Sequence, residues 1–407
     1  MDDGTVAPPA LDPPSVEVVT DALRTVIDPE LGSDVVSLGM IPSVDVSDDG
    51  VVTVGVKLTI GGCPMRAEIK RSIEDRIGVH PGVRSVRIEW GEMTSQERTA
   101  AMSTARWNAR ERAPETAIGE RCRVVAIASG KGGVGKSSVT VNLAAGLAAS
   151  GLTVGVLDAD IWGFSVPRLL GVDQPLSAAE VNGRPQITPN RLTVGKGVIE
   201  VVSTGFLVEE STALMWRGLM LTKAVEQFLR DVAWGDLDYL LIDMPPGTGD
   251  VQMGLARLLP RTSLVVVTTP ALAAQRVAQR AADMAQRSFL PVIGVIENMA
   301  GFVCQHGDLH EVFGSGGGAA LAQAVGAPLL GSVPIEADLA AGGDAGRPVI
   351  LEGNGPAAVA LRSIVDRLIE VVPVSPSTDG IDMAGCSARL LAAVESALAD
   401  ADAEPTA

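Results

Sequence analysis

Hydrophobic and polar positions follow one pattern in the N-terminal part of the chain and another in the rest. In the first part, residues 15–27 and 66–79 carry apolar side chains at helical spacing, whereas residues 50–60 and 83–90 have the spacing of strands. Helices and strands mixed over so short a stretch predict a small α+β domain, which we assign to residues 15–93.

From Cys122 onward, short apolar runs alternate with longer stretches of helical spacing. Such runs are typical of strands that are buried on both faces of a parallel sheet. We therefore predict an α/β fold of the P-loop NTPase type over residues 121–372, with a mostly parallel sheet covered by helices on both faces. The predicted strands cover residues 123–128, 153–157, 198–203, 238–242, 263–268, 291–296 and 328–333.

Three further segments flank or connect these domains. Residues 1–14 are acidic and rich in proline, and we expect a disordered leader that is not a signal peptide. Residues 94–120 have no apolar stripe and are expected to form a linker that is partly helical. Residues 373–407 are expected to form an acidic tail, which either packs on a partner or hangs free. No uninterrupted apolar run is long enough to predict a membrane span.

Composition narrows the classes of partner. The formal net charge of −17 repels DNA phosphates and anionic lipid, so we expect neither nucleic acid nor a membrane as partner. The cysteines are few and far apart, which fits a reducing cytoplasm better than a disulfide framework. They are Cys63, Cys122, Cys304 and Cys386. Because Cys122 adjoins a predicted core strand, we expect it to be structural.

A glycine-rich turn directly follows the first predicted strand of the sheet. Residues 130–137 read Gly-Lys-Gly-Gly-Val-Gly-Lys-Ser and fit the pattern G-x-x-x-x-G-K-S/T. In this pattern the loop amides and the following helix N-terminus bind phosphate oxygens, the last lysine contacts the β- and γ-phosphates, and the hydroxyl binds Mg²⁺. A chance match is disfavoured by the flanking strand and helix. The predicted nucleotide-binding loop comprises Gly130, Lys131, Gly132, Gly133, Val134, Gly135, Lys136, Ser137 and Ser138.

Three aspartates lie at the ends of two other predicted strands. Asp243 has the Walker B position, which is suited to the Mg²⁺ shell. Asp158 and Asp160 lie where ligands bind in open α/β sheets, and one of them could orient an attacking water. Each aspartate alone is also consistent with an ordinary turn residue. Their joint occurrence after a phosphate loop favours a nucleotide site in which Lys136, Asp160 and Asp243 are catalytic and Asp158 helps to bind the nucleotide.

The loop holds a second lysine, Lys131, at its first variable position. Near a two-fold axis its ammonium group could reach the γ-phosphate of a facing subunit and stabilise the charge that develops in the transition state. The alternative is an exposed loop lysine with no catalytic role.

The loop resembles the deviant Walker A motif of the MinD/ParA/nitrogenase-iron-protein class of dimeric ATPases. Within that class the chain resembles the Mrp/ApbC family of iron–sulfur cluster carrier ATPases. This resemblance implies ATP-dependent homodimers, with Lys131 acting in trans and Asp160 near the hydrolytic water. It also implies that Asn298 and residues 334–338 lie near the adenine. It rests on residues 158–171, 215–252, 267–278, 294–304, 312–318 and 331–349.

The N-terminal domain is similar to the small assembly-factor domain of SufT-type proteins. The similarity rests on residues 27–41 and on two stretches within 57–90, and the signature Cys-Pro is Cys63-Pro64. A helix N-terminus can stabilise a thiolate, so Cys63 is a candidate metal ligand. The alternative is a small buried apolar residue, which is common for a free cysteine.

The chain departs from the carrier family at the cysteines that hold the cluster. The family usually has Cys-x-x-Cys after the Glu-Asn-Met segment, so that two subunits offer four thiolates to one cluster. Here Cys304 is present, but Gly307 has the position of the second cysteine. His306 and His310 lie nearby, and histidine can replace cysteine on iron. Among the ligand candidates Cys304 ranks first, then His306, then His310. The alternative is an exposed loop that binds no metal.

The sequence as a whole is interpreted as a cytoplasmic, Mg²⁺-dependent ATPase that forms homodimers and passes an iron–sulfur cluster, of the 4Fe–4S type, to apo client proteins. Two alternatives stay open. One is a positioning ATPase of the ParA/MinD kind, which the acidic charge disfavours. The other is an adaptor in which ATP hydrolysis times the release of partners and no cluster is held.

Overall fold

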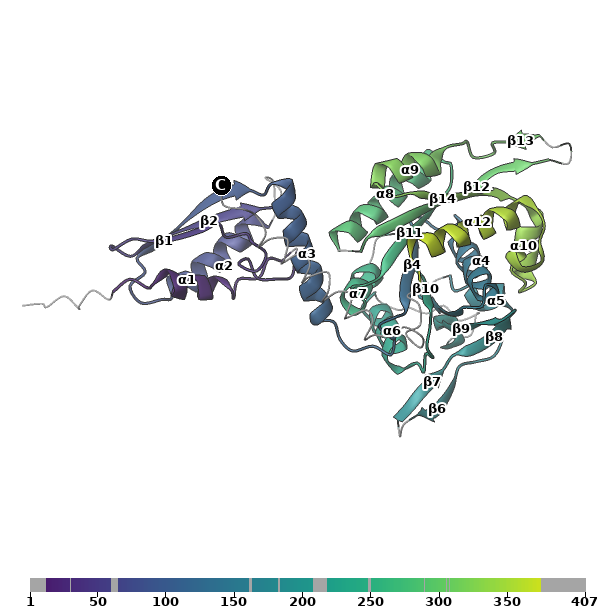
Figure 1. Cartoon of the computed structure of the whole chain (residues 1–407), viewed down its shortest axis with the longest axis horizontal. Helices are drawn as coiled ribbons and strands as arrows, with labels where there is room; N and C mark the ends of the chain where they lie inside the picture. Colours follow the sequence, from purple (N-terminus) through teal and green to yellow (C-terminus); the bar gives the residue numbers. More distant parts are fainter. Residues whose placement is uncertain are drawn as a thin grey trace, which may run out of the picture.

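The computed structural model describes residues 12–29, 31–59, 65–160, 163–181, 184–207, 218–247, 250–288, 290–304, 306 and 308–374. Cys63 and Cys386, most of the expected leader and nearly all of the expected tail lie outside these residues. The chain forms a small N-terminal unit, a long connecting helix and a larger α/β unit (Figure 1). No helix among the described residues is both long and apolar enough to cross a bilayer.

The N-terminal unit is a three-stranded sheet packed against two helices. Its strands lie in the order β1-β2-β3, with β1 antiparallel and β3 parallel to β2. Helix α2 turns Ile69, Ile73 and Ile77 onto the sheet, because residues four apart share one face of a helix. The predicted helices and strands of this unit are confirmed, and β1 is an addition. The elements are α1 (Val16–Leu23), β1 (Ser43–Val46), β2 (Val51–Leu58), α2 (Arg66–Gly78) and β3 (Ser85–Glu92).

The segment after this unit contains a long helix, α3 (Ser95–Glu111), as the expectation of a partly helical linker required. The helix packs on the N-terminal unit through Ala101 and Ala105, which are almost fully buried in its core. Asn108 donates a hydrogen bond to Ser33 Oγ at 3.2 Å, which ties the same helix to the loop before β1. This packing was not predicted, because two buried alanines make too weak an apolar stripe.

The large sheet has the strand order β13-β12-β11-β4-β10-β5-β9-β8, with β14 paired to β12. Its central strands are parallel, and among the strands of the described residues β8 and β13 alone run antiparallel to their neighbours. All seven predicted strands are confirmed as β4 (Arg123–Ser129), β5 (Thr153–Asp158), β9 (Gly197–Ser203), β10 (Tyr239–Asp243), β11 (Ser263–Thr268), β12 (Val292–Val303) and β14 (Leu329–Ile335). The predicted fold class is therefore confirmed.

Four strands of the larger unit were not predicted. They are β6 (Ser177–Val181), β7 (Arg184–Thr188), β8 (Asn190–Val194) and β13 (Leu309–His310). Strands β6 and β7 form a hairpin that projects from the sheet at the bottom of Figure 1. These strands are short, and none of their described side chains is buried, so their sequences lack the continuous apolar runs that identify buried parallel strands.

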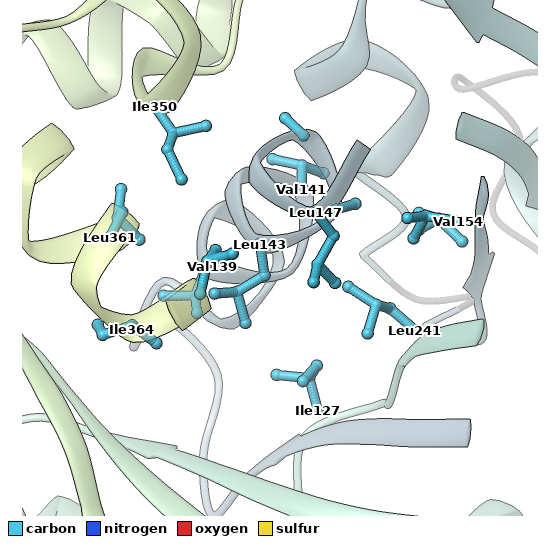
Figure 2. Close-up of a cluster of buried hydrophobic side chains, with 14 of the residues drawn as sticks. Ile127, Val139, Val141, Leu143, Leu147, Val154, Leu241, Ile350, Leu361 and Ile364 are labelled. Atoms are coloured by element: carbon cyan, nitrogen blue, oxygen red, sulfur yellow. The ribbon is translucent and has the colours of Figure 1, made fainter. Parts of the chain in front are cut away.

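Helices cover both faces of the large sheet and create two apolar cores. One core lies under α4, α5, α11 and α12, and the other under α6, α7, α8 and α9. Figure 2 shows α4 at the centre of the first core, with Leu143 and Leu147 facing Ile127 and Leu241 of the sheet. Burying one such side chain contributes about 1.5–3 kcal/mol, so this helix is held firmly. The helix bounds are α4 (Lys136–Ala149), α5 (Val166–Leu170), η1 (Thr204–Leu207), α6 (Gly218–Asp231), α7 (Asp250–Leu258), α8 (Leu272–Arg287), α9 (Gly317–Val325), α10 (Ala337–Asp344), α11 (Val349–Glu352) and α12 (Pro356–Val371).

Candidate nucleotide site and cysteine hairpin

The glycine-rich loop joins the buried strand β4 to the buried helix α4. Gly133 and Gly135 both have φ of +79°, a conformation that glycine adopts without a steric penalty. Helix α4 starts at Lys136 with no side-chain cap. Its first backbone amides are therefore available to an anion, and the helix dipole favours negative charge at the same place.

The glycines of this loop differ in the space around them. A Cβ at Gly130 would lie 2.2 Å from the backbone nitrogen of Ala278 on α8, and a Cβ at Gly135 would lie 2.2 Å from Nδ2 of Asn298. At Gly132 and Gly133 a Cβ would meet nothing within 4 Å. The loop is thus pressed against the protein at its two ends and open in its middle, which is the shape of a phosphate cradle.

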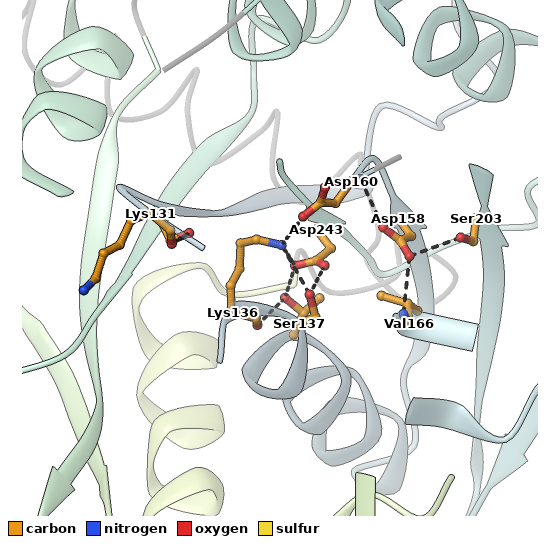
Figure 3. A network of polar contacts seen from close by, with 10 residues as sticks. Lys131, Lys136, Ser137, Asp158, Asp160, Val166, Ser203 and Asp243 are labelled. Atoms are coloured by element: carbon orange, nitrogen blue, oxygen red, sulfur yellow. Dashed lines mark hydrogen bonds and ion pairs between the residues drawn. The ribbon is translucent and has the colours of Figure 1, made fainter. Parts of the chain in front are cut away.

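Behind the loop, one carboxylate collects three donors. Asp243, at the end of β10, lies 2.7 Å from Nζ of Lys136 and accepts hydrogen bonds from the hydroxyls of Ser137 at 2.5 Å and Thr140 at 2.9 Å (Figure 3). Lys136 is also 3.8 Å from Asp160. Asp243 is fully buried. A buried carboxylate without partners would cost free energy, and these three partners offset that cost.

These residues fit a bound Mg²⁺–nucleotide. The cavity beside the loop has a volume of about 420 Å³, and its lining includes Gly133, Lys136, Ser137, Asp160 and Pro246. Ser137 and Asp243 offer oxygen atoms to a divalent cation, which would take its remaining ligands from phosphates and water. The structure therefore brings together the residues that the sequence predicted for phosphate and Mg²⁺ binding.

Asp158 has a different environment from the other two aspartates. It accepts hydrogen bonds from the backbone amides of Asp160 and Val166 and from the hydroxyl of Ser203. Figure 3 shows this set on the side away from Lys136. Burial, with Asp243 nearby as a second carboxylate, raises the pKa of Asp158 to about 7. Asp158 therefore braces the start of α5 and the loop that carries Asp160. Its predicted contact with the nucleotide stays a prediction.

The two lysines of the loop point in different directions. Lys136 is 6% exposed and lies inside the polar network, whereas Lys131 is exposed and extends away from it (Figure 3). Lys131 therefore adds no charge to the carboxylates behind its own loop. Its predicted action on a nucleotide of a facing subunit stays a prediction, and this outward direction is compatible with it.

Asn298 lies behind the loop on β12. Its side chain is almost fully buried and donates a hydrogen bond to the carbonyl of Val134 at 2.9 Å. The contact supports the loop directly. The predicted position of Asn298 and residues 334–338 near the adenine stays a prediction.

Sequence reasoning missed two polar residues of this site. Thr140 lies one helical turn after Lys136, and that i+4 spacing is the signal that could have identified it. Ser203 ends β9 in register with Asp158, and only the pairing of the two strands shows that they meet.

Strand β12 continues past the nucleotide site and forms a hairpin with β13. Phe302 pairs with His310 and Val303 with Leu309, and the amide of Cys304 donates to the carbonyl of Asp308 at 3.0 Å. Because side chains alternate along a strand, Cys304 and His310 share one face of this hairpin. We call residues 302–310 the cysteine hairpin.

The cysteine hairpin favours a reactive thiol. The pKa of Cys304 is lowered, first by a hydrogen bond with the His310 side chain and then by one with the His306 backbone. His306 itself is exposed in the turn. The sequence ranked His306 above His310 as an iron ligand, and that ranking stays a prediction. In the structure it is the His310 side chain that hydrogen-bonds with the thiol. The reason is strand register, which a sequence count cannot supply.

Cys122 differs from Cys304 in its surroundings. Cys122 is buried beside β4, and burial raises the pKa of its thiol to about 12. This fits the structural role expected for it. The proposed metal ligand Cys63 lies outside the described residues, so its role stays a prediction.

Two family models match the chain, and they match different parts of it. A model described as the NUBPL iron-transfer P-loop NTPase matches residues 121–369. The chain belongs to this family. A model described as an iron-sulfur cluster assembly protein matches residues 17–90. Both resemblances inferred from the sequence are therefore confirmed.

Several relatives match this chain over most of its length and over most of their own. A protein of Mycobacterium leprae is 43% identical over 86% of this chain and 91% of its own length, and one of Deinococcus radiodurans is 41% identical over 87% and 94%. Both are named iron-sulfur cluster carrier protein. A solved nucleotide-binding protein of Archaeoglobus fulgidus, in complex with ADP, is 35% identical over 62% of this chain and 95% of its own, with a TM-score of 0.50. The chain is thus a P-loop NTPase in its larger unit.

Proposed function

We propose that this protein binds and hydrolyses ATP with Mg²⁺ as a homodimer and carries an iron–sulfur cluster to apo client proteins. The observation that carries the proposal is the buried network of Lys136, Ser137 and Asp243 at the uncapped start of α4, in a chain of the iron-transfer family. The relatives named as cluster carriers support the second half. We assign the protein to the cytoplasm, because its few, scattered cysteines are typical of a reducing compartment.

For hydrolysis, the loop amides and Lys136 would bind the phosphates and orient the γ-phosphoryl group. Ser137 and Asp243 would hold Mg²⁺, which neutralises charge on the phosphate oxygens when bound. Asp160 lines the cavity next to Lys136, so it is the carboxylate that we assign to orienting the attacking water. Lys131 would reach the nucleotide of the partner subunit and stabilise the transition state.

For cluster transfer, Cys304 is the ligand on the exposed hairpin. Its lowered pKa favours the thiolate form that binds iron. One chain offers a single thiol here, so two copies would supply two thiols, and His310 of each copy would complete the set. Histidine replaces cysteine on one iron of Rieske 2Fe–2S centres, where it raises the reduction potential. The 4Fe–4S assignment belongs to the same proposal.

The decisive experiment for the cargo is anaerobic reconstitution with iron and sulfide. We expect the full chain to bind iron and sulfide with visible charge-transfer absorption, and Cys304→Ala to lose most of both. His310→Ala should alter the spectrum and lower retention, whereas His306→Ala serves as the matched control and should change little. Cys63→Ala reports whether the N-terminal unit takes part.

The contrary outcome favours the adaptor. If the full chain binds no iron after reconstitution, or if Cys304→Ala transfers iron to an apo client as fast as the unaltered chain, then Cys304 holds no cargo. ATP hydrolysis is tested separately by phosphate release with Mg²⁺ and with a chelator. Asp160→Asn should lose turnover while still binding nucleotide.

A further inference from the structure

Strand β12 runs from the nucleotide loop to the cysteine hairpin, and its first part is tightly anchored. The buried carboxylate of Glu297 accepts hydrogen bonds from the backbone amide of Gly318 at 2.7 Å and from the hydroxyl of Ser332 at 2.9 Å. The next residue, Asn298, donates to the Val134 carbonyl of the loop. Up to this point β12 is therefore fixed to its neighbours on both sides.

Directly after Asn298 the strand becomes irregular. Met299 has φ of +58° and is the only non-glycine residue with positive φ in the described part of the chain. Gly301 follows with φ of +128°, and the pairing of β12 with β14 shifts register between Asn298 and Phe302. A methionine in the left-handed region costs free energy and persists only where the surroundings enforce it.

The surroundings that enforce this turn come from both sites. On one side, Gly135 leaves no room for a Cβ against the Asn298 amide, so the loop is packed tightly against the strand at this point. On the other side, a Cβ at Gly301 would lie 2.9 Å from the Leu309 side chain, so the turn is packed against β13. Only residues 299–301 separate the loop contact at Asn298 from residue 302, where the cysteine hairpin begins. Figure 1 shows β12 and β13 together at one edge of the large unit.

We propose that Asn298 and the strained turn 299–301 are a positioning device that couples the phosphate loop to the cysteine hairpin. Phosphate groups would attract Lys136 and the loop amides and so displace the Val134 carbonyl. Asn298 would follow its acceptor, and the turn would convert that shift into a change in the position of Cys304 relative to Asp308 and His310. This inference rests on the proposed function, because it needs a nucleotide on the loop.

Coupling between two sites is reciprocal. If the nucleotide changes the affinity of the hairpin for its cargo, then the bound cargo must change the affinity for the nucleotide by the same factor. The device thus gives the carrier a way to bind cargo in one nucleotide state and expose it in another. It differs from a route through the loop after Asp243, because it passes through β12 alone.

The test is the rate of Cys304 alkylation in the full chain, stripped of metal by a chelator, with and without a saturating non-hydrolysable ATP analogue and Mg²⁺. Rates are read at each cysteine by mass spectrometry, and buried Cys122 serves as the internal reference. We expect the analogue to change the Cys304 rate by about fivefold or more, within the range of ordinary allosteric coupling. Asn298→Ala should bring this ratio close to one at a nucleotide concentration that saturates the variant.

The matched control is Asn142→Ala. Asn142 is also a buried amide, and its two hydrogen bonds go to Ser138 within α4 and to Ile350 of α11 rather than to the phosphate loop carbonyl that Asn298 contacts. This control should retain the nucleotide response although it loses a comparable buried contact. Because Asn298→Ala also leaves a carbonyl without its donor, Met299→Gly provides a second variant, which relieves the strain and keeps the Asn298 contact. Because the turn becomes more flexible, Met299→Gly should weaken the effect of the ATP analogue on the Cys304 alkylation rate.

The outcomes separate this inference from the proposed function. Nucleotide binding is measured on the same samples with a fluorescent ATP analogue. If the unaltered chain binds nucleotide but its Cys304 rate does not change, the coupling is refuted and the ATPase stands. If Asn298→Ala and Met299→Gly both keep the full response, the route through β12 is wrong. If no nucleotide binds at all, the proposed function itself fails.

Discussion

The nucleotide site and the cysteine hairpin belong to the same sheet but are built in opposite ways. At the nucleotide site Asp243 is fully buried and each of its oxygens has at least one partner. On the hairpin Leu309 is 60% exposed and Phe302 is 39% exposed. The residues of the nucleotide site hold one another in place, whereas the cysteine hairpin carries side chains that are largely exposed to solvent.

The difference follows from what each site must do. Charges taken out of water need several partners at once, so the residues that we propose for phosphate binding are held in place by one another. Under the proposed function the hairpin hands its cargo to another protein, and such a site has to stay accessible. The exposed apolar side chains around the hairpin, at Phe302, Val303, Leu309, Val312 and Phe313, are typical of a surface that contacts a partner.

The largest difference in the free energy of unfolding should be found between alanine variants of the two lysines of the loop. Lys136→Ala leaves Asp243 buried without its cation, so we expect the free energy of unfolding to fall by about 3–5 kcal/mol and nucleotide binding to be lost. Lys131→Ala should change unfolding by less than about 0.5 kcal/mol, because that lysine is exposed. Urea denaturation of both variants measures this; equal losses would show that the two lysines do not differ in environment.

A second comparison uses two glycines of the same loop. Gly135→Ala forces a Cβ to within 2.2 Å of the Asn298 amide at a positive φ, and we expect a loss of about 2–3 kcal/mol. Gly132→Ala has open space and should cost less than about 1 kcal/mol. Thermal or urea unfolding decides the matter. A similar cost at both positions would mean that the loop is not pressed against β12.

The third prediction concerns pH, because the pKa of an acidic group is raised at the nucleotide site and lowered on the hairpin. The pKa of Asp158 is raised to about 7, so the native state holds a proton that the unfolded state has already lost. Stability from this group therefore falls as pH rises from about 4 to about 7, at no more than about 1.4 kcal/mol per pH unit. Asp158→Asn should remove this part of the slope in urea denaturation at different pH values.

Cys304 provides the contrast, because its pKa is lowered rather than raised. Its alkylation should reach half-maximal rate at a lower pH than that of an ordinary thiol, and His310→Ala should move the midpoint upward. If stability depends on pH in the same way in Asp158→Asn, the raised pKa of Asp158 is refuted. If the alkylation of Cys304 has its midpoint at the usual thiol pKa, the lowered pKa of Cys304 is refuted.

The smallest effect should be found on the hairpin. Leu309→Ser should change the free energy of unfolding by less than about 0.5 kcal/mol, since the side chain is mostly in water. Leu143→Ala, in the core under α4, is the reference and should cost about 3 kcal/mol or more. If Leu309→Ser proved as damaging as the core variant, the hairpin would be part of the folding core rather than a contact surface.

Much of the architecture could be predicted because its signals are local. The strands β4, β5, β10 and β11 are buried on both faces, and continuous apolar runs of that kind have few other interpretations. The edge strands β8 and β13 were not predicted, because exposed antiparallel strands have no continuous apolar run. Helix α3 was expected only as part of a linker, since two small buried alanines give almost no periodic signal.

The sequence by itself determined the phosphate loop, the order of strands and helices, and the presence of a thiol near two histidines. These depend on residue types at short spacing, where backbone geometry leaves little choice. The tertiary structure decided which histidine meets Cys304, that both Asp160 and Asp243 face Lys136, and that Asn298 joins the loop to the hairpin strand. Those contacts arise from register and packing between distant segments, and spacing along the chain carries no information about them.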